Sequence, residues 1–451
     1  MKNSNKVLII IGVILLNVLV VYMVGQSLLG KTSEYDLKLG EARDYAEQEL
    51  CSKAIDMYNE VLLINDTLDV RIEMIPVYEK GMNIGEFTNT YDIFNYVGYI
   101  VEDYREEPAA YENACDFFLR YGKYDECADA LMKARDLKIT SEKIEELREQ
   151  VRYVYQKHYS MYETVMPSCS GYYVVSADGG MSLLDELGAA YSDGSYTYLS
   201  SFSQGYAFAK AIHPDGTEKS FIIDEEEQRQ VYLEGVETSS GVGAAKDKDG
   251  NTLLLLSCKV GDKYKYYKLD GKEAFGEYAF AGRFRNNIAA VMESEGQWKL
   301  IDGTGKAIVD KVFDHIIVNE FDECAPKGII IADDGEGYKL YNHLGEQIGG
   351  FVCDDAKAYI DSYIAFEEEG KWGFVDAEGN VVIAAQYDDA KSFSNKMGAV
   401  KIGEKWSFIN PENEVVIEDT FDDVDYLNSK GICFVKTDGY WSDLEFYYTG
   451  E

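Results

Sequence analysis

The spacing of hydrophobic positions changes twice along the chain, and each change predicts a different kind of structure. Residues 7–29 form a continuous apolar run, in which only Asn17 is clearly polar up to Gly25. Residues 31–159 carry apolar side chains at helical spacing. Residues 160–451 alternate apolar and polar positions in short stretches separated by Asp-Gly, Glu-Gly and Gly-Asn turns. The pattern predicts a multidomain chain: a transmembrane helix, an all-α segment and an all-β repeat array.

The apolar run over residues 7–29 is long enough to cross a membrane. At about 1.5 Å per residue it spans a hydrocarbon core of about 30 Å. Residues 1–6 contain lysines and acidic residues follow the run. The positive-inside rule therefore predicts a cytoplasmic tail over residues 1–6 and places residues 31–451 outside the cell membrane. A cleaved signal peptide is the alternative, because Gly25 and Ser27 form a weak small-x-small site.

Residues 31–159 contain a recurring helical pattern. A small residue is followed by a large one four positions on, and by a small or medium one three further on. The copies are Ala54, Tyr58, Val61; Thr90, Phe94, Val97; and Cys127, Leu131, Ala134.

This spacing resembles the tetratricopeptide repeat, a helix pair of about 34 residues. The resemblance implies a solenoid of about six helices, in which Ala42 and Tyr45 take the packing positions of a first helix. The Trp-Leu-Gly start and the closing Pro of that family are absent, so generic antiparallel helices are the alternative. The last helix is expected from Ser141 to Tyr159.

Residues 160–451 repeat a short unit in which an Asp or Asn follows a strand. These positions are Asp185, Asp224, Asp270, Asp302, Asn342, Asp376 and Asn410. The turn that follows each strand predicts that the repeated side chain caps a hairpin.

The clearest unit, residues 371–393, contains the pair Trp372-Gly373 and resembles the WG-repeat family. Two other units keep the Trp and change the Gly, in the pairs Trp298-Lys299 and Trp406-Ser407. The first three units lack the Trp. The resemblance implies a β-propeller with roughly one blade per repeat.

The two ends of the array complement each other. Residues 430–447 supply the first half of a unit, including Trp441, and residues 162–165 match its second half. A composite blade built from both ends would close the ring, which gives seven or eight blades. An open β-solenoid is the alternative.

Charge narrows the range of partners. The chain has 81 Asp and Glu against 43 Lys and Arg, a net charge of −38. Such an acidic chain is unsuited to nucleic acid and to anionic lipid headgroups, and it favours a basic protein or peptide partner.

The sequence assigns no catalytic, cofactor-binding or metal-binding residue. Residues 247–251 resemble the opening of a calcium loop but lack its later ligands, so a hairpin turn is expected. The histidines, His158, His213, His315 and His343, have no ligand spacing. The cysteines form no CxxC pair and are expected to be mostly buried: Cys51, Cys115, Cys127, Cys169, Cys258, Cys324, Cys353 and Cys433.

These observations lead to three hypotheses about function. The first is a membrane-anchored scaffold outside the cytoplasm, without catalytic activity, in a bacterial cell envelope by resemblance. It predicts mostly buried Tyr and Trp. The alternative is a module that binds cell-wall glycan through exposed Tyr and Trp on the propeller face. The third is an enzyme in the propeller funnel, which requires carboxyls with raised pKa values in one cleft.

Overall fold

The computed structural model describes residues 34–192 and 195–448, which form two compact units divided between Val154 and Tyr155. The predicted cytoplasmic tail and transmembrane helix, residues 1–6 and 7–29, lie outside the described residues. Within the described part of the chain, no helix is both long and apolar enough to span a membrane.

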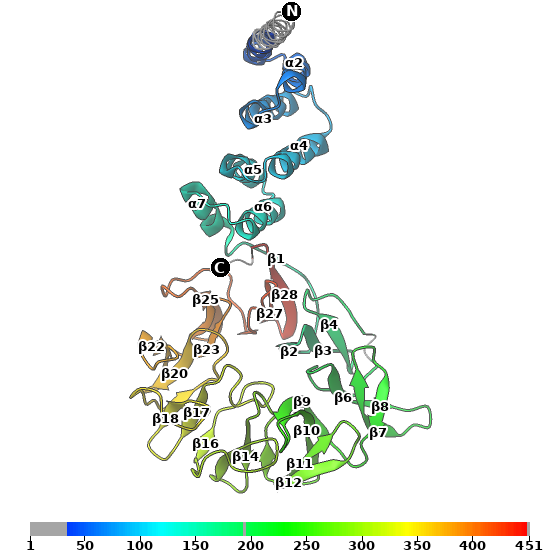
Figure 1. Cartoon of the computed structure of the whole chain (residues 1–451), viewed down its shortest axis with the longest axis vertical. Coiled ribbons are helices and arrows are strands. Elements are labelled where there is room, and N and C mark those ends of the chain that lie inside the picture. Colours follow the sequence, from blue (N-terminus) through cyan, green and yellow to red (C-terminus); the bar gives the residue numbers. More distant parts are fainter. Residues whose placement is uncertain (1–33, 193–194, 449–451) are drawn as a thin grey trace, which may run out of the picture. The chain divides into compact units, whose positions relative to one another are not determined.

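The first unit is a stack of helices (Figure 1). A helix covers residues 34–47. It is followed by α2 (Cys51–Ile64), α3 (Leu68–Asn83), α4 (Thr90–Asp103), α5 (Pro108–Arg120), α6 (Tyr124–Asp136) and α7 (Glu142–Val151). From α2 to α7, each helix contacts the next, and α5 also contacts α3 and α7. The expected stack of paired helices is therefore present.

Burial follows the repeated sequence pattern. Ala54, Tyr58 and Val61 are buried along α2, and the matching residues Cys127, Leu131 and Ala134 are buried along α6. In α4 the pattern residue Val97 is buried, whereas Phe94 is half-buried. A helix that repeats this spacing turns one apolar face to its neighbours and leaves the other face to solvent.

The last helix is shorter than expected. Ser141 does begin it, because its Oγ accepts a hydrogen bond from the Ile144 amide at 3.1 Å. The helix ends at Val151 rather than Tyr159, and β1 (Tyr155–Lys157) follows. The second unit thus begins before residue 160, because the β1 residues pair with a strand from the far end of the array.

The described residues of the second unit form eight antiparallel sheets, called blades 1–8 in chain order, which follow one another around a ring (Figure 1). Blade 1 contains β2 (Thr164–Cys169), β3 (Tyr172–Ala177) and β4 (Gly180–Asp185), and blade 2 contains β5 (Tyr198–Leu199), β6 (Tyr206–Ile212), β7 (Glu218–Asp224) and β8 (Arg229–Tyr232). Blade 3 contains β9 (Thr238–Lys246), β10 (Thr252–Val260), β11 (Lys263–Lys268) and β12 (Glu273–Tyr278). Blade 4 contains β13 (Phe280–Ala281), β14 (Ala289–Met292) and β15 (Trp298–Ile301).

Blades 5–8 complete the ring. Blade 5 contains β16 (His315–Ile316), β17 (Ile330–Asp333) and β18 (Tyr338–Tyr341), and blade 6 contains β19 (Asp355–Ala356), β20 (Ile364–Glu368), β21 (Lys371–Val375) and β22 (Val381–Tyr387). Blade 7 contains β23 (Asp389–Ser394), β24 (Met397–Ile402) and β25 (Lys405–Ile409). Blade 8 contains β26 (Asp423–Val424), β27 (Ile432–Thr437) and β28 (Tyr440–Phe446) together with β1.

Blade 8 is the predicted composite blade. β1 pairs with β28, with Gln156 opposite Glu445. Tyr162 forms a further bridge with Trp441. The sequence assignment needs one correction: Thr164 and Val165 start β2 in blade 1 and do not complete blade 8. The chain leaves blade 8 directly after Tyr162.

The core lies between successive blades. Tyr173, Val175 and Leu184 of blade 1 pack against Ile432 and Phe434 of blade 8, which closes the ring by side-chain packing as well as by strand pairing. Burial of these apolar surfaces supplies the main stabilisation.

Gly373 shows why the repeat carries a glycine after its Trp. A Cβ at this position would lie 2.5 Å from the Ile383 oxygen and 2.6 Å from the Ala385 nitrogen. These are backbone atoms of β22, so only glycine lets this strand approach so closely.

Candidate functional site

The repeated Trp side chains belong to the framework of the propeller. Trp298, Trp372 and Trp406 are 8%, 7% and 5% exposed, and Trp441 is half-buried. Trp372 packs against the buried residues of blade 7, and the Lys357 Nζ lies 4.3 Å from its ring centroid. The rings of Trp298, Trp372 and Trp406 are therefore closed to a sugar.

The repeated Asp and Asn side chains cap hairpin turns, as predicted. The Asp376 Oδ1 accepts hydrogen bonds from the amides of Glu378 and Asn380 at 3.0 and 2.8 Å. The same arrangement recurs at Asp185, Asp224, Asp302 and Asn342. These side chains are therefore satisfied by their own turns.

The calcium-like loop is the expected hairpin turn, between β9 and β10. Asp247 Oδ1 accepts from the amides of Asp249 and Asn251, both at 2.9 Å. The backbone hydrogen bond from Asn251 lowers the pKa of Asp247. The histidines lie in separate contacts: His158 with Asp443 at 2.6 Å, and His315 with the Tyr338 hydroxyl at 2.7 Å. Within the described residues, no group of three or more His, Cys, Asp or Glu is placed to hold a metal ion.

Arg283 is the largest fully buried side chain of the described chain, and it joins five blades. Its Nε and Nη2 donate to Glu323 Oε1 of blade 5, at 3.0 and 2.8 Å. Its Nη1 donates to Ser201 Oγ of blade 2 at 2.7 Å and to the Ser240 oxygen of blade 3 at 3.4 Å. Its Nη2 also lies 3.5 Å from the Cys169 Sγ of blade 1. Because every donor faces protein, this cluster holds the blades together and offers no open site.

Two carboxyls of the propeller have raised pKa values. Burial raises the pKa of Asp322 to about 6, with Arg283 opposing the shift. Burial also raises the pKa of Asp425 to about 7, with Lys391 opposing it. The Asp425 Oδ2 is buried without a hydrogen-bond partner. Arg283 lies near Asp322, whereas Lys391, Glu320 and Asp423 lie near Asp425.

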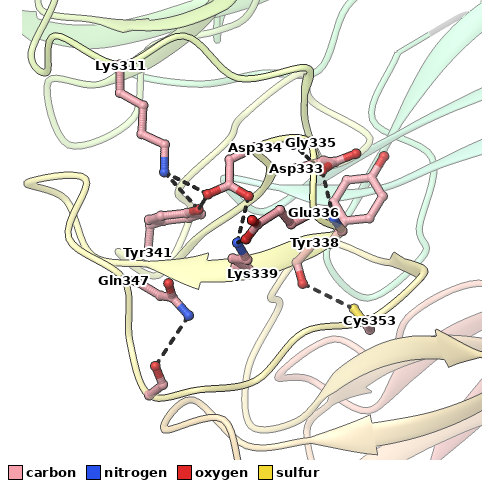
Figure 2. A network of polar contacts seen from close by, with 12 residues as sticks. Lys311, Asp333, Asp334, Gly335, Glu336, Tyr338, Lys339, Tyr341, Gln347 and Cys353 are labelled. Atoms are coloured by element: carbon pink, nitrogen blue, oxygen red, sulfur yellow. Dashed lines mark hydrogen bonds and ion pairs between the residues drawn. The ribbon is translucent and has the colours of Figure 1, made fainter.

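A third polar cluster joins blades 4 and 5. Figure 2 shows Lys311 and Lys339 pointing toward Asp334, with Tyr341 beside them. Lys339 Nζ donates to Asp334 Oδ1 at 2.7 Å, and Lys311 Nζ and the Tyr341 hydroxyl donate to Oδ2 at 3.0 and 2.9 Å. These hydrogen bonds hold the pKa of Asp334 well below its usual range, and the bond from Lys339 has the largest effect. Lys339 Nζ also donates to Glu336 Oε2 at 2.8 Å, so two carboxylates balance the two lysines and the cluster joins the blades.

The helical unit contains an open groove of about 490 Å³. It runs between α4 and α6, with Phe118 of α5 also lining it. Tyr91 and Tyr99 stand along the α4 side and are 72% and 62% exposed. The sequence pattern singled out Phe94 on this helix for packing and gave no sign of the groove. The signal that could have found it is the spacing of Tyr91, Gly98 and Glu102 along one face of α4.

The propeller has an open hollow of about 590 Å³ at blade 2. Tyr232 lines it and is 54% exposed, and the His213 ring lies 5.6 Å from the Tyr232 ring. Glu218, Glu234 and Glu237 also line the hollow. An exposed aromatic ring beside carboxylates is the kind of surface that the glycan hypothesis expects.

Comparison with known proteins finds a family model that matches part of the repeat array. Residues 372–406 and 406–441 match the family model of the WG containing repeat. A comparison with curated proteins finds no match. Similar solved structures include BamB from Moraxella catarrhalis, which is 10% identical, with 65% of this chain and 100% of that chain covered and a TM-score of 0.42. The Pan2 WD40 domain from Neurospora crassa is 9% identical, with 63% and 89% covered and a TM-score of 0.33. The β-propeller domain of Cps50 (Swd1) from Myceliophteria thermophila is 12% identical, with 58% and 99% covered and a TM-score of 0.32. Over residues 372–441 the chain is thus similar in sequence to the WG-repeat family, within a propeller-like unit that follows a helical one.

Proposed function

We propose that the protein is a scaffold without catalytic activity, which binds a protein partner and is held at the outer face of a cell membrane by residues 7–29. A stack of helices and a ring of sheets both present broad surfaces for a partner. The net charge of −38 favours a partner with a basic surface or segment.

The observation that carries this proposal is the distribution of aromatic side chains. The Trp residues of the propeller are used for packing, whereas Tyr91 and Tyr99 are exposed beside the helical groove. Tyr is enriched where proteins bind proteins, because its ring offers a large contact area and its hydroxyl accepts and donates hydrogen bonds. This division favours protein contact over sugar stacking at the Trp positions.

The scaffold is tested by capture. The chain from residue 31 onward, lacking the predicted anchor, is used as bait on cell-envelope extract from the source cells, with chemical crosslinking. The proposal expects one protein to be recovered in stoichiometric amount. Recovery of wall polymer alone, with no protein at that level, would contradict it.

The location is tested separately in intact cells. Proteases added outside should cleave a tag placed after residue 451 and leave a tag placed before residue 1 intact. Cleavage of neither tag would contradict the predicted orientation.

Glycan binding is the second candidate, supported by the hollow around Tyr232 at blade 2. Here Tyr232 would stack on a sugar ring and the surrounding carboxylates would accept its hydroxyl hydrogen bonds. Purified wall glycan should then bind the unmodified protein and fail to bind Tyr232→Ala. Equal binding by both would exclude this hollow.

A further inference from the structure

Gly98 lies in the middle of α4, where glycine is an unfavourable helix residue. Glycine in a helix usually marks a close approach or a left-handed backbone. Neither is present here: a Cβ built at Gly98 would meet no atom within 4 Å, and its φ is not positive. Packing therefore does not explain this glycine.

Gly98 lines the groove between α4 and α6, and its missing side chain keeps the groove open. Positions where a local preference is broken without a structural reason are where functional sites are expected. Keeping the groove open is the role that the structure offers for Gly98.

The two lysines of the groove are already paired. Lys133 forms an ion pair with Glu102, which links α6 to α4. Lys123 pairs with Glu126 at 3.0 Å. Both ammonium groups are therefore already engaged by carboxylates of the groove.

Two carboxylates of the groove have unused acceptor atoms. The Glu126 Oε2 is buried and has no hydrogen-bond partner. Asp129 also lines the groove, where it is exposed, and within the described residues no hydrogen bond or ion pair engages its carboxylate. A buried carboxylate oxygen without a donor, such as the Glu126 Oε2, is unfavourable until a cation or another donor reaches it.

We propose that this groove binds a segment of a partner protein in which a Lys or Arg side chain lies next to an aromatic or aliphatic one. The cation would reach Asp129 and Glu126, and the apolar side chain would pack between Tyr91 and Tyr99 across Gly98. The inference rests on the proposed function, since it names the surface and the partner chemistry of the scaffold. A guanidinium group fits best, because it donates to two carboxylates and stacks on tyrosine rings.

The first experiment uses a fluorescent peptide with one Arg-Trp pair in a Gly-Ser frame, titrated with the chain from residue 31 onward at physiological salt. Its controls are the same peptide with Glu for Arg and with Ala for Trp. The proposal expects each control peptide to bind about tenfold more weakly. Equal binding of all three, or binding of none, would overturn it.

Variants then locate the binding. Gly98→Leu fills the groove and should weaken the Arg-Trp peptide about tenfold or more. Gly40→Leu is the matched control. Gly40 also lies within a helix, a Cβ added to it would meet no atom within 4 Å, and it does not line the groove. Asp129→Asn should also weaken binding. An equal effect of both leucine variants would mean that the groove is not the site.

A photo-crosslinker in place of Tyr99 identifies the occupant in cells. The proposal expects crosslinks to a Lys- or Arg-containing segment of a different protein. Crosslinks to residues 1–33 of the same chain, or to a second copy, would overturn the partner assignment. If the captured protein is recovered equally with Gly98→Leu, the scaffold stands and the groove proposal fails. If neither form captures a protein, the scaffold itself fails.

Discussion

Trp441 and Tyr162, from opposite ends of the propeller, exchange both of their backbone hydrogen bonds. The Tyr162 amide donates to the Trp441 oxygen at 3.1 Å, and the Trp441 amide donates to the Tyr162 oxygen at 2.8 Å. Within blade 7, Trp406 and Phe421 exchange the same two bonds, at 2.9 and 3.0 Å. The ring is therefore closed by the same cross-strand pair that builds an ordinary blade.

Two side-chain contacts of Asp443, with His158 and Ser160, accompany this closure and are called the latch. Removing the latch should weaken the fold. Asp443 Oδ2 contacts His158 Nδ1 at 2.6 Å, and its Oδ1 accepts from Ser160 at 2.8 Å. Asp443→Ala removes the acceptor of the half-buried His158 and Ser160 side chains, so the free energy of unfolding should fall by about 0.5–1.5 kcal/mol. Urea unfolding measures it, with the exposed turn variant Asp262→Ala as control. Equal stability of the two variants would show that the latch contributes nothing.

Replacing only one member of the Arg283–Glu323 ion pair should lower the stability of the fold strongly. Both residues are buried, at 1% and 4% exposure. Arg283→Met leaves a buried carboxylate without its partner and should lower the unfolding free energy by about 3–5 kcal/mol. Adding Glu323→Leu removes that charge and should restore part of the loss. A double variant as unstable as the sum of the single changes would disprove this coupling.

Gly373→Ala should disturb the approach of β22. The added methyl would collide with backbone atoms of Ile383 and Ala385, which have little freedom to move. The loss should be about 1–3 kcal/mol of unfolding free energy. Gly350→Ala is the matched control, because a Cβ there meets nothing within 4 Å and its φ is not positive. Thermal unfolding that ranks the two variants equally would contradict the steric explanation.

Asp425 should make stability depend on pH. Burial raises its pKa in the folded protein from 3.8 to about 7, so between these values the folded state binds more protons than the unfolded state. The unfolding free energy therefore falls as pH rises through this window, by at most about 4 kcal/mol from this group. Asp425→Asn should remove that part of the slope and be more stable than the parent protein at pH above 7. Parallel stability curves for the two proteins would show that Asp425 is ionised in the fold.

The repeat itself could be predicted from sequence, because one blade resembles the next. The turn Asp residues, the Trp positions and the complementary ends each follow from spacing. The end of α7 could not be located, since residues 152–159 contain no Pro or Gly and so carry no stop signal. Their strand pairing depends on residues almost 300 positions away, such as Glu445 opposite Gln156.

The Arg283 cluster and the helical groove could not be predicted for a different reason. Cys169, Ser201, Ser240 and Glu323 meet at Arg283 only because the first strands of five blades converge, and their sequence spacing is irregular. For the groove, the spacing of Tyr91, Gly98 and Glu102 indicates a shared face of α4, but that α6 lies opposite this face depends on helix packing.

The central claim, a scaffold that binds protein through its helical unit, is tested most directly by comparing two tyrosine variants as bait. Tyr99→Ala alters the groove and Tyr232→Ala alters the hollow at blade 2, and both tyrosines are exposed. Quantitative mass spectrometry of the captured proteins should show the partner reduced about tenfold with Tyr99→Ala and unchanged with Tyr232→Ala. A partner retained by Tyr99→Ala and lost with Tyr232→Ala would contradict the account and place the binding surface on the propeller.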